Sequence, residues 1–260
     1  MKNISVLKRY GLMALIAVVV AAAVLFAGAG KNPEPITCTK PSATVVLGGV
    51  SGSQRSEVLE TRFFAQARYE LYRSGVCGGT TVIEVWSTEG STRVLWGAND
   101  SLRVVGDTLQ ARKLSASRAL DGAMTTVTTR YDDAVRALPA KGSGFLGWRT
   151  IAADALAELT GTKLDRRVVV VDDGVQIDDT INLNRPLTVD EATALANAVS
   201  NTTDLHGVAV TLVGVGQVAG PPPPAGGEWV HAIRTFAVRT CTATGATCRV
   251  VGSSVQSSDS

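Results

Sequence analysis

The segment TVVLGGVSGSQRS, residues 44–56, combines three local patterns that together decide the fold. Its apolar start is typical of a buried β-strand, and the glycines and serines after Leu47 are typical of a tight loop. An amphipathic helix is predicted directly afterwards, because apolar side chains recur at every fourth position: Leu59, Phe63, Ala67 and Leu71. In open α/β sheets ligands bind beyond the carboxyl ends of strands, so a site is expected in this loop.

The rest of the chain alternates between strand-like and helix-like patterns, which predicts parallel βαβ units. Strand-like patterns occupy residues 43–48, 80–88, 167–173, 207–215 and 249–251, and helical patterns occupy residues 56–74, 109–138, 150–159, 188–199 and the surroundings of 229–236. Two short pieces, residues 92–96 and 101–105, predict an antiparallel edge hairpin. We therefore predict one α/β domain over residues 43–251, a three-layer sandwich whose central sheet is mostly parallel with an antiparallel edge strand. The four consecutive valines 168–171 support this class, since they require a strand covered on both faces.

An uncharged stretch, residues 11–30, precedes this domain. Its length is close to the about 20 residues that a helix needs to cross a bilayer, so a single transmembrane helix is predicted. Positive charges on Lys2, Lys8 and Arg9 place residues 1–10 in the cytoplasm and the domain outside the membrane.

The flanks of this stretch leave its processing open. Small residues at Ala27-Gly28-Ala29 resemble a signal-peptidase site, and cleavage near Ala29 would give a secreted protein instead of an anchored one. Residues 31–42, with three prolines, are expected to form a linker. Residues 252–260, which are rich in serine, are expected to form a disordered tail.

The four cysteines suggest two disulfides, because an exported domain permits oxidation and the number is even. Three pairings are possible. Cys241 and Cys248 enclose the short, turn-rich segment TATGAT, so we prefer a local bridge there and a second bridge from Cys38 to Cys77. The spacings contain no C-x-x-C and do not match a zinc module. A formal net charge of only +2, with scattered Lys and Arg, gives no indication of a nucleic-acid partner.

Arranged in this way, the chain resembles the von Willebrand factor type A domain over residues 43–251. Members of that family carry a metal-ion-dependent adhesion site built from Asp-x-Ser-x-Ser after the first strand, a Thr or Ser in a middle loop, and an Asp after the fourth strand. Ser51 and Ser53 match the two serines, Ser143 matches the middle-loop hydroxyl, and Asp173 matches the last aspartate. The resemblance implies a protein-binding module with these four residues as metal ligands.

The departure from the family pattern is Gly49, which stands at the position of the first aspartate. Mg²⁺ prefers oxygen ligands that include carboxylates, so hydroxyls and a single Asp compensate poorly for its dehydration. The site is therefore expected to bind Mg²⁺ or Mn²⁺ weakly or not at all, with a water bridge to Asp172 or Asp173 as the remaining route. Ser51 and Ser53 could equally cap the helix that follows.

Two further interpretations stay open at this point. The segment GVSGS, residues 49–53, approaches the G-x-S-x-G motif of α/β-hydrolases, which would make Ser51 a nucleophile. A histidine base is also required, and the two candidates, His206 and His231, are unfavourably placed. The domain could instead be a purely structural subunit of an envelope complex. The preferred hypothesis is a non-enzymatic, exported module that binds an unidentified protein partner and is held to the membrane through residues 11–30.

Overall fold

The computed structural model of the chain describes residues 36, 38, 40–87, 90–140, 143–159, 164–217 and 226–252. Every element named below belongs to one unit, residues 37–260. The predicted membrane segment 11–30 and residues 253–260 of the predicted tail lie outside the described residues. In the described part of the chain, no helix combines the length and the apolar character needed to cross a bilayer.

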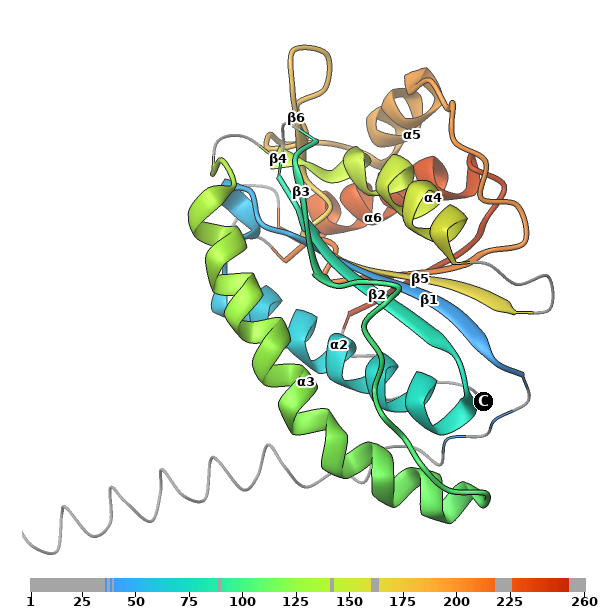
Figure 1. Cartoon of the computed structure of the whole chain (residues 1–260). Coiled ribbons are helices and arrows are strands. Elements are labelled where there is room, and N and C mark those ends of the chain that lie inside the picture. Colours follow the sequence, from blue (N-terminus) through green and yellow to red (C-terminus); the bar gives the residue numbers. More distant parts are fainter. Residues whose placement is uncertain are drawn as a thin grey trace, which may run out of the picture. The chain divides into compact units, whose positions relative to one another are not determined.

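A six-stranded sheet forms the middle layer of the domain (Figure 1). Its strands, in spatial order, are β3 (Thr92–Trp96), β2 (Thr80–Trp86), β1 (Ser42–Gly49), β5 (Asp165–Val171), β7 (Ala209–Val213) and β8 (Thr247–Val251). All neighbours pair in parallel except β3, which is antiparallel to β2 at the edge. The predicted α/β sandwich, with a mostly parallel sheet and one antiparallel edge strand, is confirmed.

Five helices cover the two faces of the sheet (Figure 1). On one face lie α2 (Glu57–Cys77) and α3 (Leu109–Ala137), and on the other lie α4 (Trp148–Glu158), α5 (Val189–Ala198) and α6 (Gly226–Thr242). The side chains of β1 separate accordingly: Val46 packs in the core under α2 and α3, whereas Val45 and Leu47 pack in the core under α4 to α6. A strand with two buried faces explains why residues 43–47 show no polar alternation.

The prediction that residues 101–105 form the second strand of an edge hairpin is wrong. This segment is irregular and lies against the helices, where Leu102 and Val104 face Gly75 of α2. The N–H of Val105 donates to the Ser115 hydroxyl at 2.9 Å, and no strand neighbour pairs with it in the described residues. Apolar residues do alternate in this segment, but their side chains pack against α2 instead of belonging to a strand.

A second small sheet was not predicted. It pairs β4 (Ser143–Gly144) with β6 (Gln176–Ile177) in antiparallel register. Two short 3₁₀ helices, η1 (Gly52–Gln54) and η2 (Phe145–Gly147), lie in the loops after β1 and β4. Strands of two residues leave almost no sequence pattern, because a period of two needs a longer run to be recognised.

Both predicted disulfides are present. Cys38, which precedes β1, is bonded to Cys77 at the end of α2, and Cys241 of α6 is bonded to Cys248 of β8. The first bond closes a span of 39 residues and the second a span of 7. Each bond therefore ties a helix end to the amino end of a strand at the same edge of the sheet.

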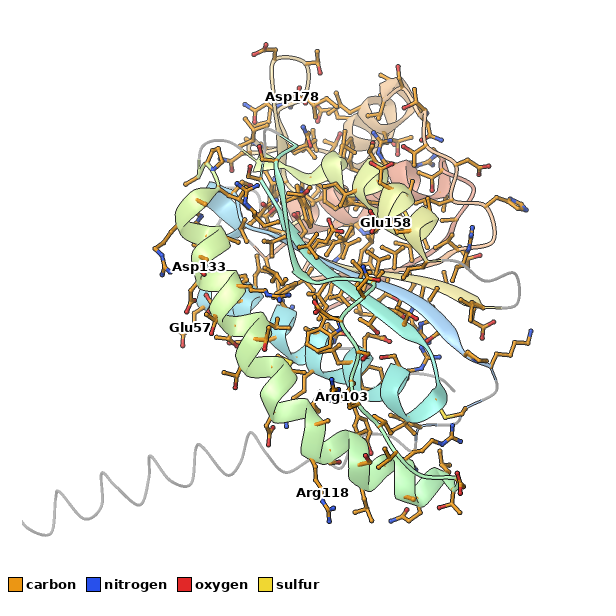
Figure 2. All side chains as sticks on the ribbon, viewed as in Figure 1. Glu57, Arg103, Arg118, Asp133, Glu158 and Asp178 are labelled. Atoms are coloured by element: carbon orange, nitrogen blue, oxygen red, sulfur yellow. A yellow bond between two sulfur atoms is a disulfide. The ribbon has the colours of Figure 1, made fainter. Side chains whose placement is uncertain are left out.

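A buried carboxyl group faces α4. Glu84 of β2 is 8% exposed, and burial together with the negative charges of Glu158 and Asp154 raises its pKa to about 7. Glu158 lies on α4, which covers that face (Figure 2). Since the folded state holds this proton more tightly than the unfolded chain, stability is greatest below pH 4.5 with respect to this group and falls as the pH rises to about 7.

Replacing Glu84 with Gln should remove this loss of stability at higher pH. We expect Glu84→Gln to raise the free energy of unfolding at pH 8 by about 1–2 kcal/mol, after allowance for partial solvent screening, and to change it little at pH 4.5. Chemical denaturation at both pH values measures the difference. Glu158→Gln, at an exposed position of α4, is the control and should have a smaller effect. Equal stability of wild type and Glu84→Gln at pH 8 would contradict the assignment.

Candidate functional site

The loop between β1 and α2, residues 50–56, lies at the carboxyl edge of the sheet. Its start is fixed by a hydrogen bond from the Val50 N–H to the Trp86 carbonyl of β2, at 2.9 Å. Arg55 fixes its end, because Nε donates to the Val50 carbonyl at 2.7 Å and a terminal nitrogen donates to the Leu138 carbonyl at 2.9 Å. The loop is thus attached to β2 on one side and to the end of α3 on the other.

The Gln54 side chain occupies the centre of this edge. Its amide nitrogen donates to Asp172 Oδ2 at 2.5 Å, and its carbonyl oxygen accepts from the backbone N–H of Ser51 at 3.0 Å and from the Ser51 hydroxyl. All three residues are at most 2% exposed. We refer to Ser51, Gln54 and Asp172 as the amide bridge, since one amide joins the β1 loop to the end of β5.

Asp172 and Asp173 follow β5 directly and are both fully buried. Burial raises the pKa of the Asp172 carboxyl well above its ordinary value and the neighbouring charge of Asp173 raises it further, against the hydrogen bonds from the Gly174 N–H and from Gln54. The Asp173 carboxylate accepts from the Val175 N–H at 2.9 Å. The carboxyl group that faces the β1 loop is therefore that of Asp172, and Asp173 serves the turn at Gly174, where φ is +80°.

Gly49 has no room for a side chain in this arrangement. A Cβ atom there would lie 2.3 Å from Asp172 Oδ2 and 2.6 Å from the side-chain carbonyl carbon of Gln54. The space that an aspartate would need at this position of the family pattern is occupied by the amide bridge. The lack of a side chain at Gly49 therefore leaves the space that the Gln54 side chain occupies.

The other predicted ligands are placed at the same edge by their backbones. Ser53 lies within η1, and Ser143 lies in β4, which packs beside η1. The indole N–H of Trp86 donates to the Gly144 carbonyl at 3.0 Å and holds β4 against β2. The structure thus brings the backbones of Ser51, Ser53 and Ser143 together at one edge. Asp172 contacts the loop through Gln54, and the predicted Asp173, buried beside it, shares a hydrogen bond with Asp172.

Sequence reasoning missed Gln54, although a signal for it was present. Ser51 and Gln54 have the S-x-x-Q spacing of a capping box, in which the third residue reaches back to the N-cap N–H. The N–H of Ser51 does donate to the Gln54 side chain. No local pattern, however, indicates that the same amide also reaches Asp172, which is 118 residues away.

As they are arranged, these residues do not fit a divalent cation. An amide N–H of Gln54 donates to Asp172 Oδ2, an oxygen that a cation would need as a ligand, so a cation could bind there only if this hydrogen bond were broken. Among the described residues, no group of three or more His, Cys, Asp or Glu side chains could hold a metal ion.

The nucleophile interpretation also lacks a base at this site. The Ser51 hydroxyl donates to Gln54 and is 0% exposed, so it is neither activated by a histidine nor accessible. His206 precedes β7 at the opposite edge of the sheet, and His231 is exposed on α6. The described geometry therefore does not assemble a Ser-His pair.

The strand order and the single antiparallel edge strand define the class of the domain. A doubly wound sheet with its first three strands in the order 3-2-1, the third of them antiparallel, and helices on both faces is a von Willebrand A-like fold. The recognition of this fold from the sequence is confirmed. The degenerate metal site that accompanied it stays a hypothesis.

Comparisons with known proteins find no matching family model but several solved structures of low sequence identity. No protein-family model matches the sequence, and no curated protein matches it. Solved structures that match include the pilus adhesin SpaC from Lactobacillus rhamnosus GG, at 14% identity and a TM-score of 0.43, covering 86% of this chain and 29% of that one. Proximal thread matrix protein 1 from the mussel byssus matches at 14% identity and a TM-score of 0.40, over 83% of this chain and 45% of that one. BatB from Bacteroides thetaiotaomicron matches at 14% identity and a TM-score of 0.40, over 82% and 91%. This chain thus spans less than half of the first two proteins.

Removing the Gln54 side chain should destabilise the domain. Gln54→Ala leaves the Ser51 N–H and the Asp172 carboxyl buried without their partner, so we expect a loss of about 2–3 kcal/mol in the free energy of unfolding, measured by chemical denaturation. Gln217→Ala, which removes a bond to the Gly252 carbonyl at a partly buried position, is the control and should cost less than about 0.5 kcal/mol. Similar losses in both variants would show that the amide bridge has no special role.

Proposed function

We propose that this chain is a non-enzymatic, extracytoplasmic protein-interaction module, anchored through residues 11–30, whose carboxyl-edge loops bind a protein partner without a divalent cation. The observation that carries the proposal is the amide bridge. In it, Gln54 occupies the space that a ligand aspartate at position 49 would need and makes hydrogen bonds with the serine and aspartate of that edge.

A rigid loop suits protein binding, because the loop then loses little conformational entropy when a partner binds. The amide bridge and the two hydrogen bonds of Arg55 hold residues 50–56 before any partner arrives. Beyond the loop, the first turn of α2 presents Glu57 and Val58 to solvent, and Val58 is 55% exposed. We propose Arg55, Glu57 and Val58 as the contact surface, since an apolar side chain within a charged rim is the usual composition of an interface.

The absence of a metal step distinguishes this proposal from a cation-dependent adhesion site. Two of the matched proteins have solved structures with metal: the mussel byssus protein with a zinc-occupied site and the Plasmodium vivax TRAP protein loaded with manganese. In this chain, by contrast, we propose that the bridging amide takes over the role of linking the β1 loop to the β5 carboxyl group.

Calorimetric titration with Mg²⁺ and Mn²⁺ tests the metal-independent part of the proposal. The wild-type chain should give no saturable heat. The double variant Gly49→Asp, Gln54→Ala should gain Mn²⁺ binding with a dissociation constant of about 1 mM or lower, because it clears the space beside Gly49 and supplies a second carboxylate. Gly49→Asp alone should lose stability instead, since its side chain overlaps Gln54. Saturable Mn²⁺ binding by the wild type that Asp172→Asn abolishes would contradict metal independence.

The contact surface is tested by a matched pair of substitutions. Val58→Asp and Val94→Asp each replace a valine that is about half exposed, 55% and 51%, but Val94 lies on β3 at the sheet edge. Proteins cross-linked to the full chain in membranes are compared by quantitative mass spectrometry. We expect Val58→Asp to lower the recovery of specific partners about tenfold and Val94→Asp to leave it unchanged. Equal recovery from both variants would place the contact elsewhere.

A further inference from the structure

A groove lies at the amino ends of β5, β7 and β8, at the opposite edge from the amide bridge. Its volume is about 450 Å³, within the range of about 300–1,000 Å³ that is usual for small-ligand sites. Its polar lining comprises Asp165, Arg166, Arg167, Thr211, Thr247 and Arg249. None of these residues takes part in the site described above.

The groove opens on the face of the sheet that α2 and α3 cover elsewhere. Alternate residues of a strand point to the same face, and Val169 and Val213 point into the core under α2 and α3. Arg167 and Thr211, two residues before them, therefore share that face. Here the sheet is not fully covered, because Ala209 and Thr247 are exposed. The groove is thus a gap beside α2, floored by strands.

The face that forms the groove carries a surplus of positive charge. Arg167 and Arg249 lie on this face with Asp165, which gives a formal net charge of +1, whereas Arg166, two residues before Val168, points to the opposite face. The Arg249 Nε donates to the Thr211 hydroxyl at 3.0 Å, which holds this side chain across the β7–β8 pair. The disulfide between Cys241 and Cys248 fixes the start of β8 next to Arg249. The Arg249 side chain is therefore held in place at the groove.

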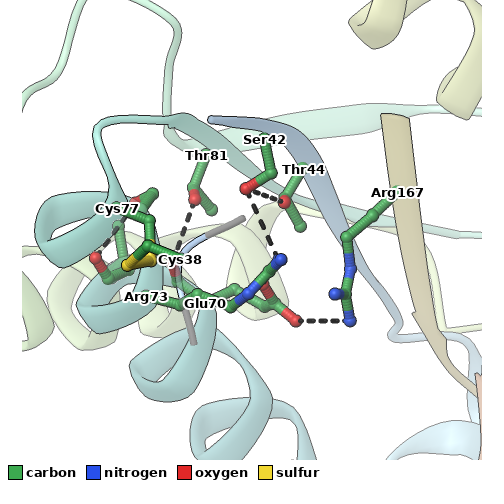
Figure 3. A network of polar contacts seen from close by, with 10 residues as sticks. Cys38, Ser42, Thr44, Glu70, Arg73, Cys77, Thr81 and Arg167 are labelled. Atoms are coloured by element: carbon green, nitrogen blue, oxygen red, sulfur yellow. Dashed lines mark hydrogen bonds and ion pairs between the residues drawn. A yellow bond between two sulfur atoms is a disulfide. The ribbon is translucent and has the colours of Figure 1, made fainter. Parts of the chain in front are cut away.

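Nearby charges compensate only part of this excess. Figure 3 shows Glu70 of α2 between Arg167 of β5 and Arg73 of α2. The nitrogen–oxygen distances from Glu70 are 3.6 Å to Arg167 and 3.5 Å to Arg73. One carboxylate, 1% exposed, thus balances two guanidinium groups and leaves a surplus positive charge beside the groove. The Arg167 side chain is 24% exposed and keeps N–H groups beyond the one that approaches Glu70.

We propose that this groove binds a phosphate group. A phosphate group is attracted by the surplus positive charge of this face, and arginine forks bind phosphate oxygens with paired, charge-assisted hydrogen bonds. The Thr247 hydroxyl, at an exposed position of the lining, supplies a further donor. The phosphate can belong to a soluble phosphorylated molecule or to an anionic lipid headgroup, and the recognition chemistry is the same. This inference is independent of the protein-interaction function at the other edge.

Titration of the full chain in a neutral detergent tests the proposal with two probes, inorganic pyrophosphate and short-chain phosphatidylglycerol, with short-chain phosphatidylcholine as the zwitterionic control. We expect saturable binding of at least one probe, weakened by added salt. The double variant Arg167→Gln, Arg249→Gln should bind about tenfold or more weakly. Arg118→Gln removes one positive charge from an exposed position of α3, outside the groove, and should bind as the wild type does (Figure 2).

Binding of pyrophosphate would indicate a soluble phosphorylated ligand, and binding of phosphatidylglycerol alone would indicate a lipid headgroup. Either result supports the proposal if the groove variant binds more weakly than the wild type and Arg118→Gln does not. The proposal is overturned if neither probe binds the wild type, or if the groove variant binds equally well. Thermal unfolding checks that the variants fold. Should the double variant not fold, Arg249→Gln alone, which removes the same single charge as Arg118→Gln, carries the comparison with a smaller expected loss.

Discussion

The burial of β1 on both faces is the constraint on which the rest of the domain depends. β1 pairs with β2 on one side and with β5 on the other, so its backbone groups are satisfied within the sheet. Its apolar side chains enter both cores, and Val45, Val46 and Leu47 are 0% exposed. Because β1 lies between β2 and β5, the loop that follows β1 lies at the carboxyl edge of the sheet between these two strands. The location of residues 50–56 follows from that packing and not from their own sequence.

The amide bridge provides hydrogen-bond partners for the polar groups that this packing buries. A loop end buried between two strands cannot leave a hydroxyl, a backbone N–H and a carboxyl group without partners, because each would cost about 1–3 kcal/mol. One amide side chain satisfies groups of Ser51 and Asp172 together, since it carries both a donor and an acceptor. A divalent cation would link hydroxyls to carboxylates in a comparable way. In this chain the amide side chain makes that link through hydrogen bonds and fixes the edge.

The two edges of the sheet have opposite electrostatic character. The carboxyl edge buries two acidic side chains, Asp172 and Asp173, and burial together with their mutual repulsion raises the pKa of Asp172. The amino edge instead gathers arginines around a single buried carboxylate, Glu70. Both disulfides lie at the amino edge, which therefore has the more strongly fixed framework. A sheet with separate chemistry at its two edges can present two independent surfaces.

The sequence by itself determined the class of fold and favoured one pairing of the four cysteines out of three. Strand and helix periods, the valine run of β5 and the close spacing of Cys241 and Cys248 are local properties, so they can be read without knowing the contacts. It also located the β1 loop as the candidate site, because a strand ending in glycines before a helix marks a carboxyl edge. Residues 101–105 show the limit of such patterns, since an apolar alternation can be satisfied by packing against a helix as well as by a sheet.

Only the tertiary structure decided what fills the site and which aspartate faces it. Gln54 and Asp172 are far apart in the chain, and their hydrogen bond exists because β1 and β5 are neighbours in parallel register. The choice between Asp172 and Asp173 depends on which side chain the strand end turns toward the loop, a matter of backbone geometry that adjacent identical residues cannot reveal. The arginine groove likewise arises from three strands that the sequence separates and the sheet brings together. Contacts between distant residues are formed by packing, and for that reason no local pattern encoded them.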